Sequence, residues 1–125
     1  MLDTNLTHIN TTDEFQEVTS QNENVMVCCG RMGPMCLPVY DVMENLEGKC
    51  SDVKFLDMDF DSSVAMDTIR RLPEVRGFNG LPFTVYFKKG KVARATSSIQ
   101  SKKDVTSILD SEFGLSCGSG QADAR

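Results

Sequence analysis

The hydrophobic positions of this chain follow two spacings, one typical of buried strands and one typical of helices. Runs such as NVMVCC (24–29) and VKFLDMDF (53–60) are almost continuously apolar, which predicts strands buried on both faces. Two further strands, at 83–87 and 92–96, flank a tight turn in which Gly90 supplies the positive φ that a hairpin requires. The strand pattern therefore predicts a sheet that ends in a hairpin.

Between these runs, apolar residues recur three or four positions apart and predict amphipathic helices. The predicted helices cover approximately 12–21, 34–47, 63–72 and 102–113. Thr11 with Glu14 is spaced as a capping box, Ser101 with Asp104 resembles a second capped start, and Gly114 is expected to end the last helix. Because strands and helices alternate, the fold class is α/β.

Composition bounds the organisation and the class of partner. The chain has 125 residues, of which 40% are hydrophobic and 25% charged, as in a single globular domain. We expect a domain over 1–113 and a flexible tail over 114–125, which is rich in glycine, serine and alanine. The formal net charge of −5 argues against general nucleic-acid binding. No apolar run approaches the ~20 residues of a membrane span and no targeting signal is visible, so we expect a cytoplasmic protein without membrane association.

The cysteines do not form a recognisable framework. They are Cys28, Cys29, Cys36, Cys50 and Cys117. Their number is odd and no two have CxxC spacing, so most are expected to be small buried hydrophobic residues in the reduced state. Since successive side chains of a strand point to opposite faces, Cys28 and Cys29 are expected to lie on different sides of the sheet.

Four local motifs together carry a family resemblance. They are Met32-Gly33-Pro34-Met35 after a buried strand, the strand VKFLDMDF, Leu81-Pro82 just before a strand, and the hairpin VYFKKGKV. Over residues 6–113 the chain resembles the thioredoxin family. The resemblance implies a thioredoxin-like fold with a central mixed sheet of four to five strands and about four flanking helices. It also implies a cis Leu81–Pro82 bond beside the active-site loop, where the preceding backbone pairs with an extended peptide.

The departures from the family pattern fall on the residues that carry its chemistry. Met32 and Met35 stand where the family has its nucleophilic and resolving cysteines, and Arg31 stands where it usually has tryptophan. Met26 or Val27 replaces the buried aspartate of many members. A thioether forms no thiolate and closes no disulfide, so disulfide reductase activity of the thioredoxin type is not expected.

These observations favour a redox-inactive module that binds or assembles with a protein partner. The expected groove consists of Arg31, Met32, Gly33, Pro34, Met35, Arg76, Leu81, Pro82 and Phe83. Methionine suits adaptable contact surfaces, and segment 70–80 carries three arginines against one glutamate, so the partner segment is expected to be extended or acidic. No cofactor is expected.

Two alternatives use sulfur chemistry. Cys36 at a helix N-terminus, with Cys28 or Cys29, would make an atypical thiol-disulfide oxidoreductase or a redox-responsive protein. One step past Met35 rotates a helical side chain by about 100°, however, so Cys36 is expected to point away from the groove. A soft-metal site built from Met32, Met35 and Cys36, with or without Cys29, matches no known ligand spacing, and no metal is expected.

Overall fold

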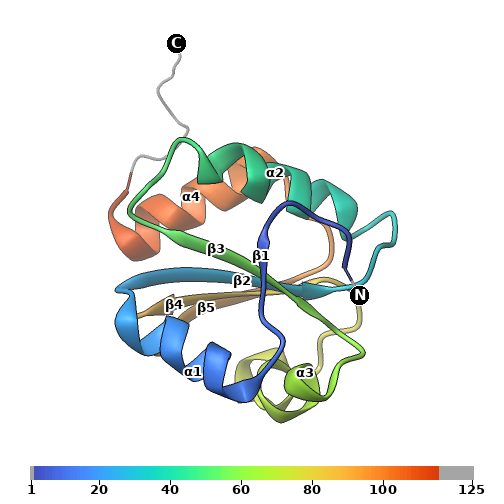
Figure 1. Cartoon of the computed structure of the whole chain (residues 1–125). Coiled ribbons are helices and arrows are strands. Elements are labelled where there is room, and N and C mark those ends of the chain that lie inside the picture. Colours follow the sequence, from blue (N-terminus) through green and yellow to red (C-terminus); the bar gives the residue numbers. More distant parts are fainter. Residues whose placement is uncertain (1, 116–125) are drawn as a thin grey trace.

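The computed structural model describes residues 2–115 and forms one five-stranded sheet with helices on both faces (Figure 1). The strands are β1 (Thr7–His8), β2 (Asn24–Gly30), β3 (Lys54–Asp59), β4 (Phe83–Lys88) and β5 (Lys91–Ser97). The helices are α1 (Thr12–Gln21), α2 (Leu37–Glu47), α3 (Ser63–Asp67) and α4 (Lys102–Phe113), with 3-10 turns η1 (Ile69–Arg71) and η2 (Pro73–Val75) before β4.

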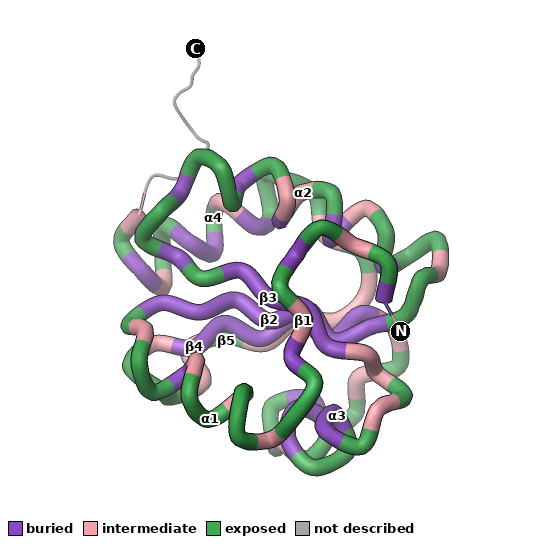
Figure 2. Tube along the Cα trace, in the orientation of Figure 1, coloured by how far each residue is buried: buried purple, intermediate pink, exposed green. Residues whose placement is uncertain are grey.

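The sheet is mixed, as the resemblance implied. Its strand order is β1-β3-β2-β4-β5, with β1, β3 and β2 parallel and with β4 antiparallel to both β2 and β5. The β4–β5 hairpin turns at Lys89 and Gly90, both with positive φ, as the sequence predicted for the glycine. This order puts β2 at the centre of the sheet, where all seven of its residues are buried (Figure 2).

Two apolar cores lie on opposite faces of the sheet. Helices α2 and α4 cover one face, and α1 and α3 cover the other (Figure 1). The side chains of β2 alternate between them, so that Cys28 enters the α2–α4 core and Cys29 enters the α1–α3 core. The predicted separation of these two cysteines is therefore confirmed.

Most helix termini follow the sequence signals. The Thr11–Glu14 and Ser101–Asp104 capping boxes both form, and Gly114 ends α4 with a φ of +70°. The prediction for the tail falls, from residue 116 onward, outside the described residues. Among the residues that are described, no helix is long and apolar enough to cross a membrane.

Two predicted helices are shorter than expected. Helix α2 begins at Leu37 rather than at Pro34, because residues 33–37 first form a separate turn in which the amides of Cys36 and Leu37 donate to the Gly33 carbonyl. Helix α3 ends at Asp67, five residues early. The Thr68 hydroxyl donates to the Val64 carbonyl, and a back-bond of this kind bends a helix. Further on, Leu72 has an extended ψ because it precedes Pro73.

Candidate functional site

The loop between β2 and α2 presents thioethers to solvent. Met32 and Met35 are 40% and 43% exposed, and Leu37 at the start of α2 is 40% exposed. All three belong to the small set of large hydrophobic side chains that stay exposed among the described residues. The loop therefore offers an apolar surface and no thiol at the two methionine positions.

Pro82 lies directly beneath this loop. The Leu81–Pro82 peptide bond is cis, and Pro82 itself is buried. A Cβ atom added to Gly30 would lie 2.9 Å from each of three atoms: Cys36 Sγ, Tyr40 Oη and Pro82 Cβ. The last residue of β2 thus brings the start of α2 and the proline into one tight contact, which requires glycine.

Ser98 holds the segment that leads into Pro82. Its N–H donates to the Gly80 carbonyl at 3.2 Å and to the Pro82 carbonyl at 3.1 Å, and its φ is +71°. Within the described residues, the N–H and C=O of Leu81 itself form no hydrogen bond. The neighbouring Ile99 is 46% exposed. Sequence reasoning missed Ser98 and Ile99, because nothing in the pattern at 97–100 distinguishes them from an ordinary loop.

The Cys36 thiol faces the interior. Its residue is 2% exposed, and its sulfur accepts the Arg31 N–H at 3.4 Å within the α2–α4 core. Burial raises the pKa of Cys28 well above its ordinary value and raises the pKa of Cys29 to about 12. Neither β2 thiol therefore supplies a thiolate near neutral pH.

Arg31 is already paired within the chain. Its guanidinium donates to both carboxylate oxygens of Asp61 at 2.8 Å, and this ion pair holds the pKa of Asp61 below its ordinary value. The same guanidinium lies 5.2 Å from the centre of the Phe60 ring, which Arg70 approaches from 4.1 Å. Arg76, by contrast, is exposed after η2, and its side chain makes no ion pair or ring contact with the described residues. Of the two predicted groove arginines, Arg76 is the one with an uncommitted charge.

Phe83 lies in the core rather than on the surface. It is 8% exposed, and its ring makes edge contacts with Phe60 and Phe78 at 5.4 and 5.7 Å. Its position as the first residue of β4 turns the side chain into the α1–α3 core. Only its backbone remains near the loop, so its side chain does not belong to the candidate groove.

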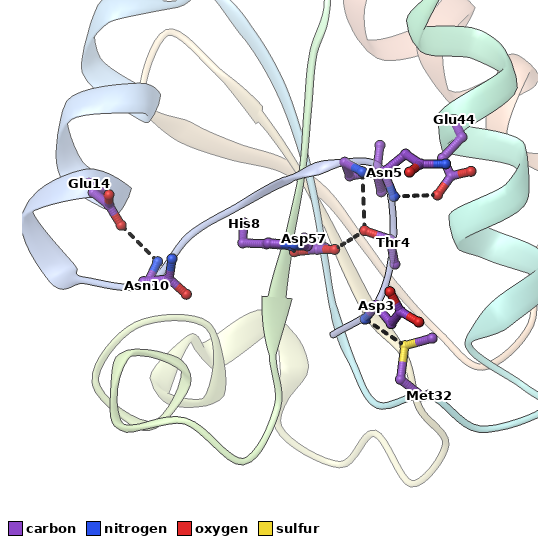
Figure 3. Close-up of polar contacts among 10 residues, drawn as sticks. Asp3, Thr4, Asn5, His8, Asn10, Glu14, Met32, Glu44 and Asp57 are labelled. Atoms are coloured by element: carbon purple, nitrogen blue, oxygen red, sulfur yellow. Dashed lines mark hydrogen bonds and ion pairs between the residues drawn. The ribbon is translucent and has the colours of Figure 1, made fainter. Parts of the chain in front are cut away.

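A polar cluster at the sheet edge was not predicted. Asp57, fully buried in β3, accepts a hydrogen bond from the Thr4 hydroxyl and pairs with His8 Nδ1 at 2.6 Å (Figure 3). Burial raises the pKa of Asp57, while the two hydrogen bonds act in the opposite direction. The sequence offered a signal, since a buried acidic residue such as Asp57 in an apolar strand needs a hydrogen-bond partner. His8, the single histidine of the chain, was a candidate partner.

The described residues form no metal site of the His, Cys, Asp or Glu type. Over residues 2–115, no three or more His, Cys, Asp or Glu side chains are placed to hold a metal ion. The candidate site consists of the exposed thioethers of Met32 and Met35, the buried Pro82, and the backbone N–H and C=O of Leu81.

Comparison with known proteins places this architecture. No protein-family model and no curated protein matches the sequence. Among solved structures, a mutant thioredoxin from Halobacterium salinarum is similar with a TM-score of 0.72 and 21% identity, covering 92% of this chain and 98% of that one. Plasmodium falciparum thioredoxin is similar with a TM-score of 0.69 and 18% identity, covering 85% of this chain and 98% of that one. Mitochondrial thioredoxin 3 of Saccharomyces cerevisiae is similar with a TM-score of 0.66 and 19% identity, covering 88% of this chain and 95% of that one. The chain has the thioredoxin fold.

Proposed function

We propose that this protein is a cytoplasmic, redox-inactive module that binds an extended segment of a protein partner beside the Met32–Met35 loop. One observation carries the proposal: Met32 and Met35 expose thioethers at the loop where a thioredoxin exposes its dithiol, and the nearest thiol, Cys36, is 2% exposed. A surface of this kind makes contacts and transfers no electrons.

The proposed groove has a backbone component and a side-chain component. The N–H and C=O of Leu81 are available to pair with a partner strand, because only the carbonyls of Gly80 and Pro82 are taken by Ser98. Met32 and Met35 form one apolar wall, and Ile99 extends the apolar surface near Gly80. The partner segment is therefore extended and carries at least one apolar side chain.

The arginine charges near the groove contribute less to partner choice than the sequence suggested. Arg31 is paired with Asp61, so of the two groove arginines Arg76 is the one whose charge is available to an acidic residue of the partner. An exposed pair of this kind adds about 0–1 kcal/mol. The apolar wall and the Leu81 backbone carry the proposed affinity, and an acidic residue in the partner adds to it.

Selection from a random library of extended peptides tests the groove directly. Peptides enriched on the wild-type chain are expected to bind Met35→Glu about tenfold more weakly, because a buried unpaired carboxylate costs more than 1 kcal/mol. Met66→Glu is the matched control, since Met66 on α3 is 50% exposed and lies outside the proposed groove. Affinities are measured by calorimetry. In NMR spectra, the resonance of the Leu81 backbone amide is expected to shift on binding.

Two results would contradict the groove. One is an enriched peptide whose affinity falls equally in Met35→Glu and Met66→Glu. The other is a bound peptide that leaves the Leu81 amide resonance unchanged. Arg76→Glu measures the smaller charge contribution in the same experiment, with an expected loss of about threefold or less.

The second candidate function is thiol redox chemistry by Cys36. Cys28 is its better partner, since both lie in the α2–α4 core while Cys29 faces the other side. We expect no reduction of insulin above the rate of dithiothreitol alone, because both sulfurs are buried and the pKa of Cys28 is raised. Turnover that is lost in Cys36→Ser would establish the redox function and reject the redox-inactive one.

A further inference from the structure

We propose that residues 2–6 form a strap whose Asp3 N–H occupies the Met32 sulfur, so that a partner competes with the strap for this partly exposed thioether. Three hydrogen bonds tie this segment to the Met32 loop, to β3 and to α2, and a fourth lies within the segment itself (Figure 3).

Asp3, near the start of the strap, contacts the loop that carries Met32 and Met35. The backbone N–H of Asp3 donates to the sulfur of Met32 at 3.3 Å, and the N–H of Asn5 donates to Glu44 of α2 at 2.8 Å. Leu2 and Leu6 are 6% and 3% exposed, and both pack into the α2–α4 core. Met32 is therefore partnered within the chain, whereas Met35, with almost the same exposure, has no such contact among the described residues.

The fixed end of the strap is anchored at Asp57. The Thr4 hydroxyl donates to this carboxylate, which joins the strap to β3, and it accepts the N–H of Leu6 at 3.1 Å within the strap. His8 holds the other carboxylate oxygen at 2.6 Å from within β1. A buried carboxylate needs these donors, so the same bonds that satisfy Asp57 also position the strap.

The strap is separable from the rest of the fold. Residues 2–6 belong to no helix or strand, and an open cavity of about 150 Å³ borders the strap at Leu2, with His8 and Asp57 among its other lining residues. Opening this segment exposes Leu2 and Leu6 but breaks no helix or sheet hydrogen bonds, so it costs less than unfolding the domain. The strap can therefore open while the sheet and α2 stay folded.

The functional consequence rests on the proposed groove. A partner that contacts the Met32 sulfur has to replace the Asp3 N–H, so part of its binding free energy is used to open the strap. A partner that uses only Met35 and Leu81 binds without this cost. The strap thus selects for segments that can displace it.

Methionine oxidation measures strap closure without any partner. Hydrogen peroxide transfers one oxygen atom to a thioether, giving the sulfoxide and water, and peptide mass spectrometry gives the rate at each methionine. In the wild-type chain, Met32 is expected to oxidise more slowly than Met35 although their exposed fractions are 40% and 43%. In Thr4→Val, which removes the anchoring hydroxyl, the Met32 rate is expected to rise about two- to fivefold.

The chain supplies its own controls. Met35 and Met66 report the rate of exposed methionines in the same sample, and neither is expected to change in Thr4→Val. Thr7→Val makes the same substitution three residues along, at an exposed position without a side-chain hydrogen bond among the described residues. It is expected to leave the Met32 rate at the wild-type value.

Amide hydrogen exchange gives a second measurement. The amides of Asp3 and Asn5 keep their acceptors in Thr4→Val, so faster exchange at both reports opening of the strap rather than loss of a partner atom. Equal oxidation of Met32 and Met35 in the wild-type chain would overturn the proposal, as would unchanged oxidation and exchange in Thr4→Val. If the oxidation and exchange results hold but the chain binds no peptide, the groove is rejected and the strap proposal is retained.

Discussion

The double variant Met32→Cys, Met35→Cys is expected to reduce insulin with dithiothreitol at about tenfold or more above the uncatalysed rate. The wild-type chain is expected to show no such turnover. The change restores the two thiols, while the loop and the cis proline are already in place.

The surroundings of the loop support this expectation. Position 35 lies two residues before α2, whose N-terminus favours negative charge. Both side chains are already about 40% exposed, so a substrate disulfide can reach them. Pro82 lies against the end of β2 beneath the loop.

Controls separate catalysis from structural effects. Met32→Ser, Met35→Ser has similar volume changes and no thiol, so it should remain inactive. Circular dichroism and urea unfolding establish that each variant folds. A folded double-cysteine variant that stays inert would mean that the groove around Leu81 and Pro82 has lost the shape needed to present a disulfide to the loop.

The order of elements could be predicted because each rests on local pattern. The apolar run 24–29, the Thr11 and Ser101 caps and the turn at Gly90 each have short-range causes, and all of them form as expected. The resemblance placed Met32 and Met35 on the loop after β2, and their exposure is known from the structure. The early end of α3 did not follow, since the Thr68 back-bond competes with helix continuation in a way that hydrophobic spacing does not record.

Contacts between distant segments could not be predicted in the same way. The Thr4–Asp57 bond joins residues 53 apart, and the Arg31–Asp61 pair joins residues 30 apart. Because sequence spacing does not reveal such long-range contacts, Arg31 was expected to meet a partner, whereas it is paired with Asp61 within the chain. Phe83 was placed in the groove for the same reason, although the pleat of β4 turns its ring into the core.

Gly30→Ala is expected to be the most destabilising small substitution in the site. Its Cβ would lie 2.9 Å from Cys36 Sγ, Tyr40 Oη and Pro82 Cβ at once, well inside contact distance. Relief requires a shift of α2 or of the proline, and overpacking of this kind costs about 1–3 kcal/mol of unfolding free energy. Urea unfolding measures the loss. Gly33→Ala is the matched control, since no atom lies within 4 Å of its added Cβ, and it should change stability by about 0.5 kcal/mol or less.

A double-mutant cycle identifies the cause of the Gly30→Ala loss. Tyr40→Phe removes one of the three crowding atoms, and that hydroxyl is buried without a hydrogen-bond partner in the described part of the chain, so the single variant should be neutral or slightly more stable. In the Gly30→Ala background the same change should recover part of the lost stability, which is a non-additive effect between touching residues. Strict additivity would mean that the Cys36 and Pro82 contacts alone set the cost. A Gly30→Ala variant as stable as wild type would show that the loop and α2 move apart easily, and would remove the rigid floor on which the proposed groove depends.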